Sequence, residues 1–100
     1  MNWLEIVNIR TAGKTEFIKA LECCGHIQQD LEAGGTVCAC VYHNTIYATD
    51  LSIHLFWDSA TSSPAKTSVG IQLSKSLTRF GLIDHKIWQP VQMNKDGVAS

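Results

Sequence analysis

Long apolar runs, clusters of basic residues and signal sequences are all missing from this 100-residue chain. No segment approaches the ~18 apolar residues of a membrane-spanning helix, and the N-terminus lacks the positive charge and apolar core of a signal peptide. Eight basic and nine acidic residues are spread through the chain, so no patch suits phosphate backbones or anionic lipids. We therefore expect a cytoplasmic protein that binds neither nucleic acid nor membranes.

Motifs of the common enzyme and metal-binding classes are also absent. The sequence contains no Gly-rich phosphate loop, no nucleophile elbow and no spaced pair of carboxylates. The cysteines form the pairs Cys23-Cys24 and Cys38-x-Cys40, and neither has the Cys-x-x-Cys spacing of a redox helix or zinc knuckle. A zinc site made of Cys38, Cys40 and His54 is disfavoured, because cysteines that are parallel on a strand converge poorly on one ion. We predict free thiols, no metal site and no cofactor.

The sequence does contain six punctuated blocks, in the order strand, helix, strand, strand, helix, strand. The strands show two-residue alternation, and the helices carry an apolar stripe at helical spacing. The predicted strands span residues 3–10, 36–43, 51–57 and 82–91, and the predicted helices span residues 14–32 and 63–81. We predict one domain over residues 1–91 and a flexible polar tail over residues 92–100.

Capping residues predict where the two helices begin and end. Thr15 is the expected N-cap of the first helix, and the glycines at 34–35 are expected to end it. Ser63 followed by Pro64 is expected to start the second helix. A Ser side chain accepts a hydrogen bond from a free backbone N–H of the first turn, and Pro suits the first helical position. Gly81 is the expected stop of that helix.

Two strand–helix–strand units in tandem predict an α+β, ferredoxin-like βαββαβ fold, with a four-stranded antiparallel sheet and both helices on one face. The other sheet face would be open to water. The predicted alternation places Cys38, Cys40, Tyr42 and Phe56 on this open face. Exposed apolar patches of this kind usually mark an interface, so we expect a homodimer that pairs through the open faces.

The block order, the strand ending in residues 55–59 (Leu-Phe-Trp-Asp-Ser) and the Gly81-Leu82 turn resemble the dimeric α/β barrels, and among them the antibiotic biosynthesis monooxygenase-like proteins. The resemblance covers about residues 3–91. It implies a homodimer with a cavity either between the sheet and the helices or between the two sheets. Some members of this group oxidise polycyclic aromatic compounds with no metal or organic cofactor, and others bind and degrade haem.

The haem-degrading members use an Asn in the first strand, a Trp at the end of the third strand and a His on the following helix. Asn8 and Trp57 match the first two of these positions. No His lies between Ala60 and Gly81, so the resemblance gives no support to haem chemistry.

His54 is the candidate catalytic residue. It lies mid-strand between Ser52 and Phe56 on the mixed face, where an imidazole could orient or deprotonate a phenolic ligand. Its alternative role is a hydrogen bond across the dimer interface. The candidate ligand-binding residues are Asn8, Cys40, Tyr42, Phe56, Trp57 and His85.

Two functions follow from these candidates. One is a cofactor-free, monooxygenase-like enzyme that acts on a hydrophobic aromatic small molecule. The other is a non-catalytic homodimer that binds a small molecule or serves as an assembly module.

Overall fold

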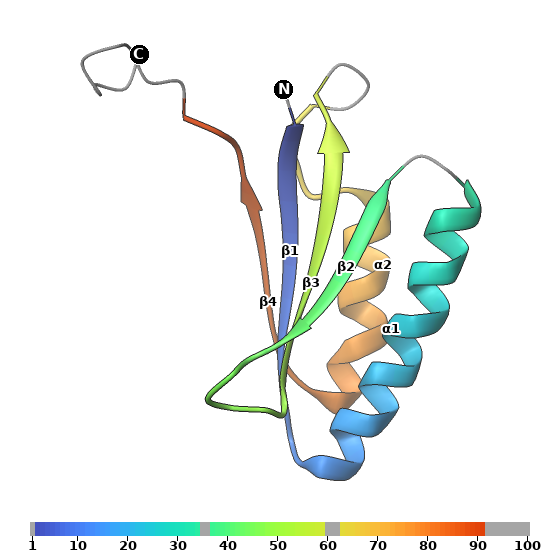
Figure 1. Cartoon of the computed structure of the whole chain (residues 1–100), viewed down its shortest axis with the longest axis vertical. Coiled ribbons are helices and arrows are strands. Elements are labelled where there is room, and N and C mark those ends of the chain that lie inside the picture. Colours follow the sequence, from blue (N-terminus) through green and yellow to red (C-terminus); the bar gives the residue numbers. More distant parts are fainter. Residues whose placement is uncertain (1, 35–36, 60–62, 92–100) are drawn as a thin grey trace.

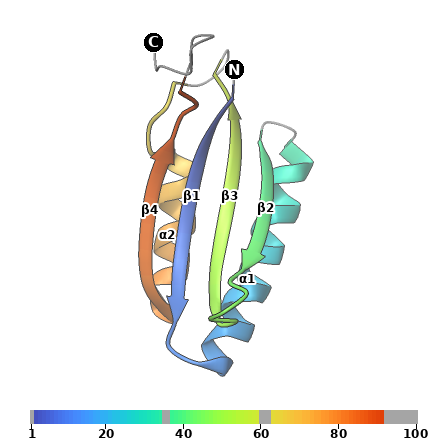
Figure 2. The ribbon, with the colours of Figure 1, turned by 60° about the vertical axis from the view of Figure 1, so that its left-hand side comes forward.

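A four-stranded antiparallel sheet carries two helices on one of its faces (Figure 1). The computed structural model describes residues 2–34, 37–59 and 63–91. The elements in chain order are β1 (Asn2–Thr11), α1 (Lys14–Gly34), β2 (Cys38–His43), β3 (Asp50–Asp58), α2 (Ser68–Leu77), the 3₁₀ helix η1 (Thr78–Phe80) and β4 (Gly81–Trp88). The strand order is β2-β3-β1-β4, and α1 and α2 lie side by side behind the sheet in Figure 2. The predicted ferredoxin-like βαββαβ fold is confirmed.

Side-chain alternation along β1 and β3 decides which residues face the helices. Odd-numbered positions of both strands are buried, whereas the even-numbered positions point to the open face. Each large apolar side chain buried in this way contributes about 1.5–3 kcal/mol. A one-residue slip of β3 would exchange Leu55 for His54 in the core, so the apolar pattern holds the register.

The predicted start of α2 at Ser63-Pro64 is wrong. The N-cap is Thr67, whose side-chain oxygen accepts a hydrogen bond from the Gly70 N–H at 3.0 Å. Thr67 also donates its hydroxyl to Glu5 Oε1 at 2.6 Å and its backbone N–H to Glu5 Oε2 at 2.9 Å. These contacts with the first strand place the helix start at Thr67 and outweigh the local Ser-Pro signal.

One other predicted cap, Thr15, is also wrong. α1 already includes Thr15, which therefore lies within the first turn. The predicted stop at Gly81 is confirmed, because α2 ends at Leu77 and the chain continues into η1, whose C-cap is Gly81; the same residue begins β4. A Cβ atom at Gly81 would lie 2.0 Å from the Arg10 carbonyl oxygen, so the close pairing of β4 with β1 requires glycine here.

The predicted flexible tail over residues 92–100 lies outside the described residues. Within the described ranges, neither helix has the length and apolar character needed to cross a bilayer.

All four cysteines are unpaired. Burial raises the pKa of the Cys24 thiol to about 12, which keeps that sulfur protonated and unreactive.

Candidate functional site

The open face of the sheet is divided into an apolar half and a polar half. Strand pairing aligns its side chains in rows that run across β2, β3, β1 and β4. The two rows of the apolar half are Cys38, Phe56, Leu4 and Trp88, then Cys40, His54, Ile6 and Lys86. The two rows of the polar half are Tyr42, Ser52, Asn8 and Asp84, then Asp50, Arg10 and Leu82. His54 therefore lies in the row that borders the polar half.

A cavity of about 610 Å³ lies over the polar half, and Asn8, Tyr42 and Ser52 contribute to its wall. Its size falls in the range of roughly 300–1,000 Å³ that is usual for small-molecule pockets. Within the part of the chain that the structure describes, no hydrogen bond is made by the Asn8 side chain, so its amide is free to bind a ligand.

The charged side chains that line this cavity are all paired, and the partner of Asp84, Lys86, does not itself line it. Arg10 Nε lies 3.3 Å from Asp50 Oδ2, and Lys86 Nζ lies 3.3 Å from Asp84 Oδ2. These pairs cancel in net charge, so the cavity suits a neutral ligand better than a phosphate or a polyamine.

His54 contacts two residues of the cavity wall. Its Nε2 atom lies 2.8 Å from Ser52 Oγ, and its ring lies 4.6 Å from the Tyr42 ring, tilted by 50°. On the other side, the Phe56 ring lies 6.4 Å away. Burial lowers the pKa of His54, so the imidazole is neutral at neutral pH and can accept a proton.

Tyr42 is held in its protonated form. A hydrogen bond with the Cys40 side chain is the largest cause that raises the pKa of the Tyr42 phenol. At neutral pH Tyr42 is therefore a neutral aromatic surface with a hydroxyl at its tip. This suits it to stacking against a planar ligand.

The predicted site residues divide between the two faces of the sheet. The open face holds His54, Asn8, Cys40, Tyr42 and Phe56. Trp57 and His85 lie on the opposite face, under the helices. Asn8 and Trp57, which match two positions of the haem-degrading pattern, are therefore separated by the sheet and do not share a pocket wall.

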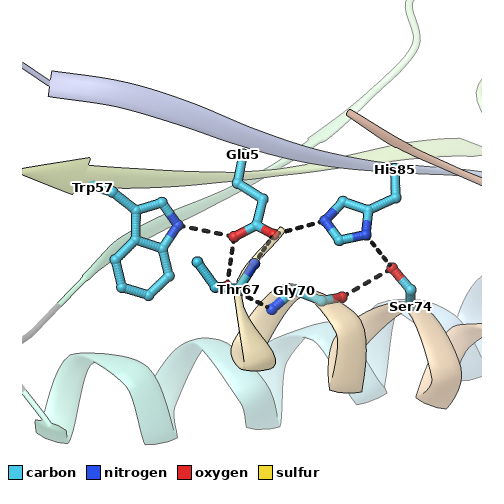
Figure 3. Close-up of polar contacts among 6 residues, drawn as sticks. All are labelled: Glu5, Trp57, Thr67, Gly70, Ser74 and His85. Atoms are coloured by element: carbon cyan, nitrogen blue, oxygen red, sulfur yellow. Dashed lines mark hydrogen bonds and ion pairs between the residues drawn. The ribbon is translucent and has the colours of Figure 1, made fainter. Parts of the chain in front are cut away.

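Trp57 and His85 converge on the buried side chain of Glu5, as Figure 3 shows. Trp57 Nε1 donates to Glu5 Oε1 at 2.9 Å, and His85 Nε2 lies 2.6 Å from Glu5 Oε2. Thr67 supplies the other two donors from the start of α2. Glu5 has no exposed surface, and these partners offset the cost of burying its carboxylate.

Sequence reasoning missed Glu5 as a site residue. One signal was available, because Glu5 lies between Trp3 and Val7 on the alternation that forms the core face of β1. A carboxylate at such a position needs hydrogen-bond donors. Its partners could not be named from the sequence, since they come from β3, β4 and the residue before α2.

Comparisons with known proteins bear on the fold. No protein-family model and no curated protein matches the chain. A solved structure from Bacteroides thetaiotaomicron, described as a conserved protein of unknown function and possible oxidoreductase, has a TM-score of 0.66 and 12% identity, covering 87% of this chain and 95% of its own. The structure of Rv0793 from Mycobacterium tuberculosis has a TM-score of 0.64 and 8% identity, covering 92% and 97%. At these identities the similarity shows a shared fold.

Proposed function

We propose that this chain is a homodimeric protein of the dimeric α/β-barrel type that acts as a cofactor-free, monooxygenase-like enzyme on a hydroxylated aromatic compound. The observation that carries the proposal is the cavity on the open face, whose charged side chains are paired and whose wall residues Tyr42 and Ser52 both contact a neutral His54. A pocket of ligand size beside a histidine with a shifted pKa is the usual arrangement of a small acid–base site.

The apolar half of the open face supports the dimer. Phe56 is 36% exposed and Trp88 is 55% exposed in the single chain, and they share a row with Leu4. A two-fold axis parallel to the strands would place each apolar half against the apolar half of the second copy. The two polar halves would then face each other and enclose the cavity between the sheets.

The contacts at His54 suggest how a phenol would be activated. A ligand ring stacked on Tyr42 would bring its hydroxyl to Ser52, and its second polar group to the Asn8 amide. The phenol then gives its proton to Ser52 Oγ while Ser52 gives its own proton to His54 Nε2. The resulting phenolate is a better electron donor to O₂ than the phenol.

The oxidation proposed for this phenolate balances without a further reactant. One O₂ converts a ring C–H opposite the hydroxyl to a carbonyl, which gives a quinone and one water. The four electrons that reduce O₂ all come from the aromatic compound.

Oxygen uptake by the full chain tests this proposal. With 1-naphthol and a panel of phenols that carry a C–H opposite the hydroxyl, we expect one O₂ consumed for each quinone formed, as followed with an oxygen electrode and by quinone absorbance. The control is Ser52→Ala, which removes the hydroxyl between the cavity and His54 and should slow both signals together. Absence of oxygen uptake with every compound of the panel would reject the enzyme.

A non-catalytic dimer that binds the same kind of ligand is the second candidate. It is favoured by the pairing of Arg10 with Asp50 and of Asp84 with Lys86, since neither pair is free for an acid–base step. In that case 1-naphthol should shift the NMR signals of Asn8 and Tyr42 without any oxygen being consumed.

A further inference from the structure

A second cluster of reactive groups lies on the helix-covered face of the sheet (Figure 3). Glu5 Oε2 lies 2.6 Å from His85 Nε2, and His85 Nδ1 lies 3.4 Å from Ser74 Oγ. Carboxylate, imidazole and hydroxyl in this order form the relay that activates a serine for attack on carbonyl carbon. The open-face site uses none of these three residues.

The hydrogen bonds around Glu5 determine which nitrogen of His85 can take up a proton. Trp57 Nε1 and the Thr67 backbone N–H can only donate, and the Thr67 hydroxyl accepts from Gly70 N and so gives its own hydrogen to Glu5. Glu5 is therefore an acceptor in each of these bonds, as an ionised carboxylate is. We assign the hydrogen between Glu5 and His85 to Nε2, which leaves Nδ1 as the proton acceptor.

The start of α2 holds these groups in place. Gly70 lies so close that a Cβ atom there would be 2.1 Å from Glu5 Oε2 and 2.9 Å from His85 Nε2. The first turn of α2 therefore packs directly against the Glu5 carboxylate, and the next turn places Ser74 near His85 Nδ1. The His85 side chain is only 8% exposed, whereas Ser74 is a half-buried residue.

We propose that Ser74 is a nucleophile, activated by His85 and Glu5, that takes the acyl group of small activated esters. The hydroxyl now donates to the Gly70 carbonyl at 2.9 Å and turns its hydrogen to Nδ1 for attack. As Ser74 Oγ bonds to the ester carbonyl carbon, Nδ1 takes the proton, and the ester C–O bond then breaks as that proton passes to the leaving alcohol. Water later releases the acid and restores the hydroxyl.

The position of Ser74 also sets the kinetics. It lies in the middle of α2, where backbone N–H groups are used within the helix and do not stabilise an oxyanion. The lack of an oxyanion site slows both acylation and release, but the good leaving group of an activated ester speeds acylation alone, so release of the acid should be the slower step. The expected signature is a burst of product and a trapped acyl-serine.

Reaction of the full chain with p-nitrophenyl acetate and with diisopropyl fluorophosphate tests the proposal. We expect a burst approaching one p-nitrophenolate per chain, with the acetyl or phosphoryl group located on Ser74 by peptide mass spectrometry. Ser74→Ala should abolish this label, and the matched control Ser76→Ala, at an exposed serine of the same helix, should keep it. No label on Ser74 in the unaltered protein, or equal labelling of Ser74 and Ser76, would overturn the proposal.

The role of His85 needs its own variant. His85→Gln should lower the rate of Ser74 labelling by ~10²-fold or more, the size expected when a general base is lost. Circular dichroism shows whether this variant is folded, and the labelling site in the unaltered chain decides the claim if it is not. If a folded His85→Gln protein is labelled at the unaltered rate, His85 does not activate Ser74 and this part of the proposal is rejected. His54→Ala should label normally, so failure here is distinct from failure of the open-face site.

Discussion

Glu5 Oε2 and His85 Nε2 lie 2.6 Å apart in a pair that is almost wholly removed from solvent. The pair joins the central strand β1 to the edge strand β4, and Thr67 ties Glu5 to the start of α2. Replacement of Glu5 by Ala would leave the donors of Trp57, Thr67 and His85 without their acceptor. We expect a loss of about 3–5 kcal/mol in the free energy of unfolding, measured by urea denaturation. The control Glu22→Ala, on the exposed side of α1, should change it by less than about 0.5 kcal/mol.

Replacement by alanine should change the stability of the protein in opposite directions at two helical glycines, Gly70 and Gly25. Gly70→Ala would drive a methyl group into Glu5 and His85 and should destabilise the protein by about 1–3 kcal/mol. Gly25, in the middle of α1, has nothing within 4 Å of the position of a Cβ atom. Gly25→Ala should therefore stabilise the protein by about 0.5–1 kcal/mol. Thermal unfolding of both variants measures this difference in stability. Equal changes in the two variants would contradict the close packing of α2 against Glu5 and His85.

Phe56 provides the test of the dimer. Phe56→Glu would place a charge in the apolar half of the open face, and burial of an unpaired charge costs several kcal/mol. Sedimentation velocity should then show a monomer where the unaltered chain is a dimer. Ile71→Glu, at an exposed position of α2, should leave the dimer intact. An unaltered chain that is monomeric at micromolar concentration would reject pairing through this face.

His54 should make the stability of the folded chain sensitive to acid. Burial lowers its pKa in the folded chain, so the unfolded chain, with a His pKa of about 6.5, binds the proton more readily. Stability from the neutral imidazole is thus present above about pH 6.5 and is lost as the pH falls below it. Tyr42 and Cys40 of β2 flank the ring, and Lys86 lies in the same row on β4, so no carboxylate in that row compensates the imidazolium. The free energy of unfolding, measured by urea denaturation, should fall between pH 7 and pH 5, and His54→Gln should remove most of this change.

The fold could be predicted from the sequence because the local patterns agreed with it. The alternation in β3 separates Leu55 and Trp57 from His54 and Phe56, and the structure keeps this separation. The start of α2 could not be predicted, since Thr67 gains its partner from Glu5, far away in the chain. A local capping signal carries no information about such a contact.

The candidate site was predictable only in part, for the same reason. His54 and Tyr42 were grouped by alternation and lie in neighbouring rows, whereas Asn8, which lies in the row of Tyr42, was proposed from the family resemblance. Trp57 and His85 were assigned to the same site and instead lie on the other face. Both side chains contact Glu5. This contact depends on the strand order and on the packing of α2 against the sheet, and no local sequence pattern predicts either of them.

The rate of oxygen uptake by His54→Ala tests the open-face site most directly. With a compound of the naphthol panel that the unaltered chain oxidises, this variant should turn over ~10²–10⁴ times more slowly, the usual loss for a general base, with unchanged circular dichroism. His26→Ala, at an exposed histidine of α1, should keep the original rate. Equal rates for the two variants, or a change in dimer dissociation alone, would contradict the account.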